Sequence, residues 1–498
     1  MHITHRLLSI ITMVAIGTLG SFGAFESRAY AGGYFSGTKG ARAAGRSGAF
    51  VAKADDLSAV ELNPAGLARI GTTLIQVGNR FSSNYQLYSR ASILDWSNTN
   101  DLGTPKFVEF DPVQNSAPWQ LLDPMIGVAT NFGLKNWGFA ISAYSPAGIS
   151  KEQFPVDGPQ KYMMVSREVQ ILYYTASAAW KHKDKFGVGA TLQWIDTANL
   201  KYQIVVDGNT FANTVNPVSS NLDMLATLKG KDHFGFGAIV GAWYYPTPNF
   251  QLALSGQLVP ENLNVASNLS ISPVSPDFEG EIELHREGDP ANDVTLTLPL
   301  PLVARLGFRY IFTKKNRELF DLELDASYES WSRVRDFEID GNGLVAEVSG
   351  QKIDIDKIAI PKQWQDTFSV RLGGDVHVLP KHLDLRAGVS YESSAAKPAF
   401  ANVDFFTSKQ IGASAGASIR FSGFEIALAY NFLHQPLMSV REDQSRVFQQ
   451  VPGSPCKAPF TEPNVCNEHF FGKPSAPANT GTYRARYHSA SIDLLYRF

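Results

Sequence analysis

Apolar and polar residues alternate with a period of two along several segments of the chain. Within residues 383–392, one face would carry Leu383, Leu385, Ala387, Val389 and Tyr391, and polar residues separate them. Residues 320–329, 368–378, 411–421 and 424–432 alternate in the same way. Because successive side chains of a strand point to opposite faces, these segments are predicted to be β-strands. A soluble β-sandwich would show the same alternation, so the pattern alone does not separate the two classes.

The connections between these segments alternate between short and long along the chain. Short links rich in Lys, Asn, Pro or Gly occur at 135–136, 182–185, 246–249, 313–317, 380–382 and 422–423. Long polar stretches lie near 90–124, 147–166, 206–231, 272–293, 341–363, 394–408 and 435–481. Outer-membrane barrels have short periplasmic turns and long external loops. The sequence therefore predicts an all-β, antiparallel transmembrane barrel of about 14 strands over residues 71–498.

The last predicted strand also alternates apolar and polar faces. Its lipid-facing residues would be Ala490, Ile492, Leu494, Tyr496 and Phe498, with Ser491, Asp493 and Arg497 facing inward. A terminal aromatic residue after such alternation resembles the signal that the bacterial barrel-assembly machinery recognises. We therefore expect Phe498 to contact that machinery, the alternative being a terminal Phe that arose by chance.

The first 31 residues are predicted to be a signal peptide. Arg6 precedes an apolar run over residues 7–25, and the small-residue site Ala29-Tyr30-Ala31 follows. An uncleaved anchor helix is the alternative for this run. No later segment approaches the roughly 18 continuous apolar residues of a spanning helix. We therefore expect an exported protein of the outer membrane of a Gram-negative-type bacterium, surrounded by membrane lipids and lipopolysaccharide.

Residues 32–70 form a Gly- and Ala-rich segment without strand-like alternation. Helix-forming stretches occur here, with Asp55 or Asp56 near a helix start, and Asn63-Pro64-Ala65-Gly66 is predicted to stop any helix. Side chains alone cannot fill the lumen of a 14-stranded barrel. The segment is therefore predicted to be a small helical hatch that blocks the lumen.

A family resemblance appears at the same residues. The run at 54–67, Ala-Asp-Asp-Leu-Ser-Ala-Val-Glu-Leu-Asn-Pro-Ala-Gly-Leu, resembles the hatch motif of FadL-type transporters of long-chain fatty acids and other hydrophobic compounds. Residues 296–310, 328–332 and 385–391 are similar to later strands of that family. One departure is Glu61-Leu62, which stands where the family commonly has an aromatic pair.

The resemblance implies passive uptake of hydrophobic molecules, most typically long-chain fatty acids. External loops would capture the molecule, the hatch would rearrange, and the cargo would leave sideways through the barrel wall. Aromatic hydrocarbons are an alternative cargo, because local motifs do not encode pocket shape. A structural or secretion-associated barrel is an alternative function, because similar Asn-Pro-Ala hatches resemble those of such proteins.

Candidate site residues follow from the resemblance and from local patterns. Lys161-Tyr162 is similar to a basic-Tyr pair of the family, so Lys161 is expected to bind a ligand carboxylate, with Lys362 as a second choice. A solvated loop lysine is the alternative for Lys161. Apolar residues at helical spacing, Leu222, Leu225 and Leu228, are expected to form a patch on an external loop. Pro146 and Gly148, at the end of the third strand, are expected either to break the wall or to begin a loop.

Composition and charge narrow the function further. The net charge of -3 provides no basic surface for nucleic acid. Gly412-Ala413-Ser414-Ala415-Gly416 matches a hydrolase pattern but lies within a predicted strand, where that chemistry lacks its turn. Neither an enzyme, a metal site nor a cofactor is expected. Cys456 and Cys466 are expected to pair in an oxidising periplasm.

Overall fold

The computed structural model of the chain is a closed antiparallel barrel. It describes residues 38–99, 105–146, 149–207, 222–259, 262–278, 280–315, 317–348, 350–449 and 476–498. The predicted signal peptide and both cysteines, Cys456 and Cys466, lie outside these residues. The first strand, β1 (Leu74–Arg90), pairs with the last, β25 (Gly481–Arg497), from Leu74 opposite Arg497 to Arg90 opposite Gly481. This pairing closes the wall.

Fourteen strands make up the wall, as predicted, and several of them are interrupted. In chain order they are β1; β4, β5 and β6 (Val113–Gln114, Trp119–Gln120, Pro124–Thr130); β7 and β8 (Trp137–Tyr144, Ile149–Gln153); β9 (Ser166–His182); β10 (Phe186–Val206); β11 (Met224–Thr247); β12 and β13 (Phe250–Leu258, Leu263–Pro273); β16 and β17 (Asp293–Leu298, Val303–Lys314); β18 and β19 (Arg317–Glu329, Asp336–Val348); β20 and β21 (Gln351–Pro361, Thr367–Leu379); β22 (Leu383–Glu392); β23 (Gln410–Phe421); β24 (Phe424–Val440); and β25. Further hairpin strands are β2 (Ile93–Thr99) with β3 (Pro105–Val108), and β14 (Ile282–Arg286) with β15 (Asp289–Pro290).

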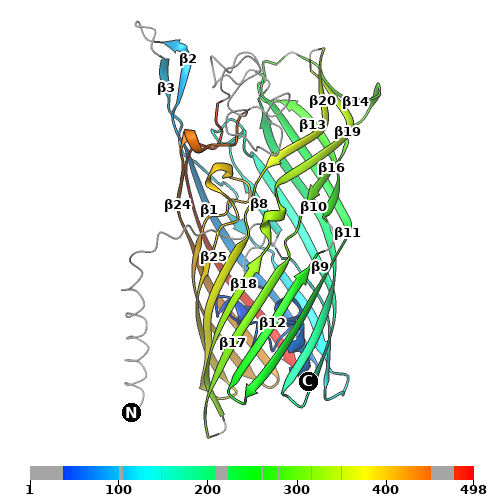
Figure 1. Cartoon of the computed structure of the whole chain (residues 1–498), viewed down its shortest axis with the longest axis vertical. Coiled ribbons are helices and arrows are strands. Elements are labelled where there is room, and N and C mark those ends of the chain that lie inside the picture. Colours follow the sequence, from blue (N-terminus) through cyan, green and yellow to red (C-terminus); the bar gives the residue numbers. More distant parts are fainter. Residues whose placement is uncertain are drawn as a thin grey trace.

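The two rims of the barrel differ as the connection lengths predict. Short turns and the C-terminus lie at the lower end in Figure 1, whereas β2, β3, β14, β19 and β20 extend to the upper end. Short turns mark the periplasmic rim of an outer-membrane barrel. The lower end is therefore periplasmic and the upper end external.

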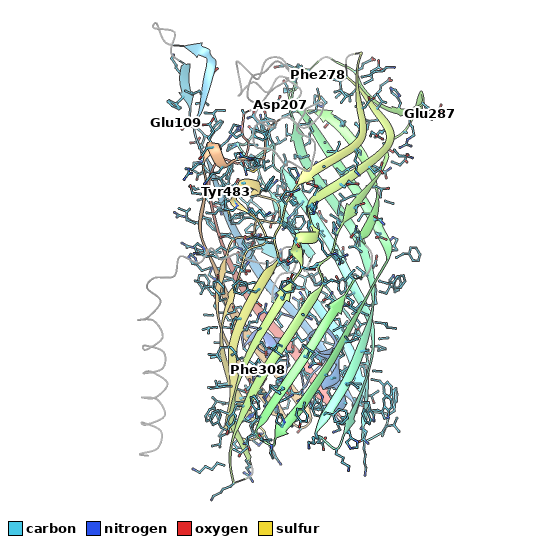
Figure 2. All side chains as sticks on the ribbon, viewed as in Figure 1. Glu109, Asp207, Phe278, Glu287, Phe308 and Tyr483 are labelled. Carbon is cyan, nitrogen blue, oxygen red and sulfur yellow. The ribbon has the colours of Figure 1, made fainter. Side chains whose placement is uncertain are left out.

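In the lower part of the barrel, the strands have an apolar outer face and a polar inner face. On β22, Leu385 and Val389 are 46% and 53% exposed, whereas Asp384 and Arg386 are buried. Figure 2 shows Phe308 low on the barrel, and Phe278 and Glu287 near the upper rim. The exposed apolar residues form the band that faces lipid, because lipid-facing and lumen-facing residues alternate in such barrels.

Among the described residues, six strands are interrupted at about the same level, because the breaks in neighbouring strands lie opposite one another in the pairing. The gaps separate β5 from β6, β7 from β8, β12 from β13, β16 from β17, β18 from β19 and β20 from β21. Exposed apolar residues such as Leu258, Tyr328 and Phe368 lie directly at the lower edge of these gaps. The interruptions therefore mark the upper edge of the lipid-facing band. We call β8, β13, β16, β19, β20 and the adjoining upper parts of β9, β10 and β11 the upper tier.

The hatch occupies the lower half of the lumen (Figure 1). It contains α2 (Ala41–Ala44), α3 (Ala59–Leu62) and the 3-10 helix η1 (Pro64–Arg69). The prediction that Asn63-Pro64 stops any helix is wrong in part: α3 ends there, but η1 begins at Pro64. Proline is well suited to a first helical turn, and the Asn63 side chain accepts a hydrogen bond from the Ala65 backbone N–H. Within the described residues, no helix is long and apolar enough to cross a membrane.

Candidate functional site

Ion pairs hold one side of the hatch to the wall. The Arg46 guanidinium lies 2.7 Å from Asp321, 2.9 Å from Glu323 and 3.0 Å from Asp375, and all four side chains are fully buried. Lys53 lies 3.0 Å from Asp321 and 3.2 Å from Asp375. Buried charges are tolerated only when they are paired and hydrogen-bonded. The carboxylates on β18 and β21 therefore hold the hatch as well as balancing its charge.

Wall carboxylates also accept hydrogen bonds from the hatch backbone. Asp325 Oδ2 accepts from the backbone N–H groups of Phe50 and Val51, at 2.7 and 2.9 Å. Asp493 Oδ2 on β25 accepts from the Ala41 N–H at 2.7 Å. These acceptors satisfy donors that would otherwise be buried without partners. The alternating Asp and Glu residues of β18 thus have a structural use that their pattern alone did not reveal.

Residues 63–66 hold the hatch to the wall at β10 and β11. Asn63 Nδ2 donates to the carbonyl oxygens of Val51, at 2.9 Å, and Ala242, at 3.2 Å. Trp243 Nε1 donates to the Ala65 carbonyl at 2.9 Å. A Cβ atom on Gly189 would lie 2.6 Å from the Ala65 nitrogen, so only glycine permits this close approach. The predicted hatch motif therefore packs the hatch against the barrel wall. Its role in gating stays a prediction.

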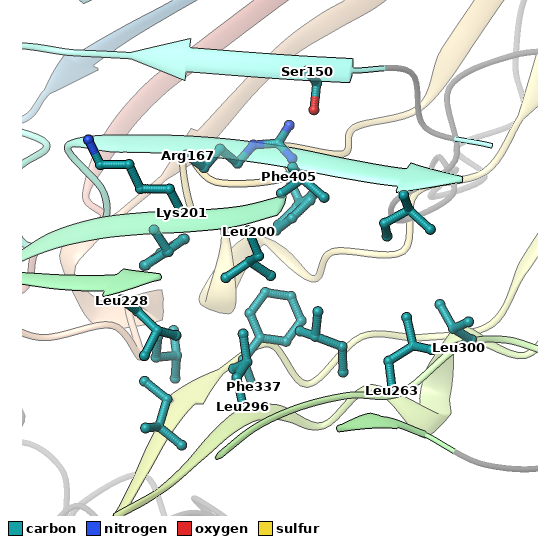
Figure 3. Close-up of a pocket in the computed structure, with 16 residues that line it drawn as sticks. Ser150, Arg167, Leu200, Lys201, Leu228, Leu263, Leu296, Leu300, Phe337 and Phe405 are labelled. Carbon is teal, nitrogen blue, oxygen red and sulfur yellow. The ribbon is translucent and has the colours of Figure 1, made fainter. Parts of the chain in front are cut away.

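An apolar pocket lies within the upper tier (Figure 3), and the hatch lies lower in the barrel (Figure 1). Leu, Val, Ile and Phe side chains from β9, β10, β11, β13, β16, β19 and β20 form most of its lining. A concave site lined mainly by apolar side chains suits an apolar molecule.

Arg167 lines the pocket and has partners within the protein. Arg167 donates two hydrogen bonds to Glu152, at 2.8 and 2.9 Å, and lies over the Phe405 ring at 3.8 Å from the centroid. Lys201 extends away from Leu200 and from the pocket centre in Figure 3. A bidentate pair occupies the edge of a guanidinium that would otherwise bind another carboxylate. The strongest interaction of Arg167 is therefore with Glu152 of the same chain.

Lys362 is buried beside the pocket rather than within its lining. Its Nζ atom lies 2.5 Å from both carboxylate oxygens of Asp404, and Tyr202 donates a hydrogen bond to the same carboxylate at 2.8 Å. The predicted ligand-binding lysine therefore already has a protein carboxylate as its partner. Sequence reasoning missed Asp404, because a long external connection gives no signal of what its residues contact.

Lys161 and Tyr162 converge on another buried carboxylate. Lys161 Nζ lies 2.7 Å from Asp223, and the Tyr162 hydroxyl donates to Asp223 at 3.2 Å. Burial raises the pKa of the Asp223 carboxyl, although Lys161 and Tyr162 oppose the shift. The alternative of a solvated Lys161 is wrong, since the residue is 8% exposed. Neither Lys161 nor Tyr162 lines the pocket, and their part in ligand binding stays a prediction.

The helical spacing predicted for Leu222, Leu225 and Leu228 is wrong. β11 begins at Met224, and Leu228 lies opposite Tyr202 of β10 and Leu269 of β13. Pairing on both sides stabilises an extended backbone, which overrides the local spacing. Leu228 lines the pocket, Leu225 is partly buried, and Leu222 is 44% exposed.

Pro146 interrupts the third strand instead of ending it. β7 stops at Tyr144 and β8 starts at Ile149, and both pair with β9. Proline cannot donate to the ladder, which explains a break at this position. Gly148 lies outside the described residues. The opening of the wall here stays a prediction.

Comparison with known proteins agrees with this architecture. The family model described as outer membrane protein transport protein (OMPP1/FadL/TodX) matches residues 24–454. A FadL homologue from Pseudomonas aeruginosa is similar in structure, with a TM-score of 0.68 and 17% identity over 94% of this chain and 100% of that chain. The toluene transporter TodX of Pseudomonas putida has a TM-score of 0.59 and 14% identity over 93% of this chain and 99% of its own.

The toluene transporter TbuX of Ralstonia pickettii has a TM-score of 0.57 and 15% identity over 93% of this chain and 98% of its own. No curated protein matches the sequence. At such identities the structural likenesses show the fold, whereas the family model covers most of the chain and shows the family. The chain therefore belongs to the OMPP1/FadL/TodX family, whose members lie in the outer membrane and transport hydrophobic compounds across it.

Proposed function

We propose that this chain carries hydrophobic molecules passively across the outer membrane, with the upper-tier pocket as its binding site. The observation that carries the proposal is an apolar pocket that external strands enclose and that lies above a hatch blocking the lumen. A molecule captured from outside would reach this pocket first. Burial there gains about 0.8 kcal/mol for each methylene group removed from water.

The pocket chemistry favours uncharged cargo. Long-chain fatty acids are the most typical cargo that the family resemblance implies, but Arg167 and Lys362 are already paired with Glu152 and Asp404. A fatty-acid anion would have to displace one of these carboxylates or remain unpaired at the pocket centre, from which Lys201 extends away, and both cost free energy. We therefore propose aliphatic or aromatic hydrocarbons as the favoured class, in line with the two toluene transporters of similar fold.

The exit route is part of the proposal. The hatch lies below the pocket and is held by buried ion pairs, so a straight path through the lumen requires its displacement. A sideways exit at the interruption beside Pro146 would keep an apolar cargo out of water. A structural or secretion-associated barrel remains the rival function, and it would not bind small hydrophobic molecules.

Competition binding on the purified protein tests both points. The probe is N-phenyl-1-naphthylamine, an uncharged dye that fluoresces in apolar surroundings, with decane, toluene and laurate as competitors. We expect each hydrocarbon to displace the dye at about tenfold lower concentration than laurate, which is roughly 1.4 kcal/mol of preference. Stronger competition by laurate would identify a fatty-acid transporter. No dye binding at all would favour the rival function.

A matched pair of variants locates the binding site. Leu298 lines the pocket, and Leu298→Glu would place a charge among apolar side chains. Leu254 lies on the lipid-facing side of β12, is 58% exposed, and is not part of the pocket lining. We expect Leu298→Glu to abolish dye binding and Leu254→Ala to leave it unchanged. Heat-modifiable migration on gels verifies that both barrels are folded.

A further inference from the structure

The outer face of three adjacent strands carries no acidic side chain. β24 pairs with β25, and β25 pairs with β1, so the three strands form a continuous part of the wall. Their sequences contain two acidic residues, Glu425 and Asp493, and both are buried against the hatch. A cation that points outward from these strands therefore has no acidic neighbour on them.

Arg484 and Arg486 are two such cations. Both are exposed on the outer face of β25, and Ala485 between them is buried. Arg486 lies opposite His434 of β24 and Tyr85 of β1. Residues opposite each other on antiparallel strands share a face of the sheet, so these two side chains flank Arg486. Among the described residues, neither arginine has an ion pair. We call Arg484 and Arg486 the external arginines.

Two other exposed arginines near the external rim differ in this respect. Arg286 and Arg441 each lie 3.1 Å from a carboxylate oxygen, of Asp293 and Asp443 respectively. Such exposed pairs contribute little stability, but they balance charge locally. Within the part of the chain that the structure describes, the charge of the external arginines is not balanced in this way.

The external arginines lie at the level where the lipid-facing band ends. Below them on the same face of β25, Ile492 and Leu494 are 43% and 46% exposed. Ten residues of a strand tilted by roughly 40° rise about 25 Å, which is about the height of the apolar band of such barrels. This is the separation in sequence between Tyr496, near the periplasmic rim, and Arg486. Arg486 is therefore at the outer boundary of the band.

Aromatic residues directly below the external arginines mark the same boundary. The Tyr430 hydroxyl lies 2.7 Å from His488 Nδ1, and the ring centroids of Phe432 and His488 are 5.0 Å apart. On the other side of β25, Ser83 of β1 lies opposite both His488 and Trp119, and the Trp119 side chain is 69% exposed. Tyrosine and tryptophan are enriched where a membrane meets water. The external arginines are thus at the level of the lipid head groups.

We infer that the external arginines bind the phosphorylated head group of lipopolysaccharide. A guanidinium can hold a phosphate through two parallel hydrogen bonds, and basic clusters at a membrane surface recognise anionic lipids. Lipopolysaccharide is the phosphate-bearing lipid of the outer leaflet, which is the leaflet that this end of the wall meets. The Tyr85 hydroxyl on the same face is a further hydrogen-bond donor. The site lies outside the barrel, so the inference goes beyond the proposed function and does not depend on the cargo.

Removal of both external arginines tests the site. The readout is the Kd for diphosphoryl lipid A, measured by native mass spectrometry of the full chain in detergent. We expect Arg484→Gln/Arg486→Gln to raise this Kd about thirtyfold, which corresponds to roughly 2 kcal/mol for two cations at a charged lipid surface. Heat-modifiable migration on gels verifies the fold, and dye binding in the upper-tier pocket should stay unchanged.

The matched control removes two exposed cations with the same spacing from β11. Lys229 and Lys231 lie above the exposed Phe234, but Asp232 follows them directly, and Asp196 of β10 contacts the next residue of β11. We expect Lys229→Gln/Lys231→Gln to change the Kd less than about twofold, because carboxylates already lie beside these lysines. Equal losses in the two double variants would show that lipid A is attracted by charge in general, and would overturn the site.

Two further ligands identify the source of the phosphate. Phosphatidylglycerol has one phosphate on a phospholipid, and inorganic phosphate has no lipid. We expect the unmodified protein to bind diphosphoryl lipid A about tenfold more tightly than phosphatidylglycerol, because two phosphates can meet two guanidinium groups. Equal affinity for phosphatidylglycerol would overturn the assignment to lipopolysaccharide. Displacement of lipid A by millimolar inorganic phosphate would instead identify a site for the free anion.

Discussion

Lys362 Nζ lies 2.5 Å from each carboxylate oxygen of Asp404, and both side chains are shielded from solvent. Lys362→Met would leave this carboxylate buried without its cation, so we expect the free energy of unfolding to fall by about 3–5 kcal/mol. Thermal or urea unfolding of the purified barrel measures the loss. Laurate binding, measured where the variant is folded, should not change.

The double variant Lys362→Met/Asp404→Asn is the control, because it removes both charges. We expect it to recover most of the lost stability, since a neutral amide can still accept from the Tyr202 hydroxyl. A selective loss of laurate binding in folded Lys362→Met would instead show that this lysine binds ligand carboxylates, as the second-choice prediction from the sequence has it.

Asp223→Asn should create an anion site at Lys161. The substitution removes the carboxylate 2.7 Å from Lys161 Nζ, so octyl sulfate should bind more tightly to the variant than to the unmodified protein. Lowering the pH should have the same effect on the unmodified protein, because burial raises the pKa of Asp223 and protonation then frees the lysine. Octyl sulfate remains anionic throughout, so the variant should lack this pH dependence. Binding that falls with decreasing pH in both proteins would contradict the explanation.

Arg46→Met should loosen the hatch. The substitution leaves Asp321, Glu323 and Asp375 without the cation that lies between them, at a cost of about 3–5 kcal/mol. We expect larger ion conductance across planar bilayers and faster proteolysis of the hatch. Arg441→Ala, which removes an exposed pair with Asp443, is the control and should change neither quantity.

Gly189→Ala tests the close packing of the hatch against β10. The added Cβ would meet the Ala65 nitrogen at 2.6 Å, so the hatch or the strand must shift, and we expect a loss of about 1–3 kcal/mol in stability. Gly256→Ala is the matched control, because its nearest neighbour would be the Val303 carbonyl at 3.5 Å, an ordinary contact. Equal unfolding curves for the two variants would show that the hatch does not depend on this contact.

The wall was largely predictable from the sequence. Which residues of β22 and β25 face lipid follows from alternation alone, because strand geometry is local and the membrane imposes one polarity on each face. The plug was predictable for a related reason, since residues 32–70 lack alternation and a wide barrel requires something in its lumen. The helix boundaries within the hatch were less predictable from the sequence, because Pro64 both ends α3 and begins η1.

The candidate site was less predictable because its contacts are distant in sequence. Lys362 and Asp404 lie 42 residues apart, and Tyr202 joins them from another strand. The segment around Leu225 is too short for its spacing to separate helix from strand, and pairing with β10 and β13 decides the outcome. Pro146 was recognised as a strand breaker, but whether the strand resumes depends on its partner β9.

The interruptions that separate the upper tier from the band below also have an evolutionary consequence. Backbone pairing restarts at each of them, so the register above a gap is not dictated by the register below it. Changes in the interrupted cargo-binding strands need not propagate into the membrane anchor or its hatch, whereas β9, β10 and β11 run through both parts. Chimeras that join segments of homologous proteins at these gaps should therefore fold. In them, the upper segments should determine ligand preference, and the lower segments should determine insertion into the membrane.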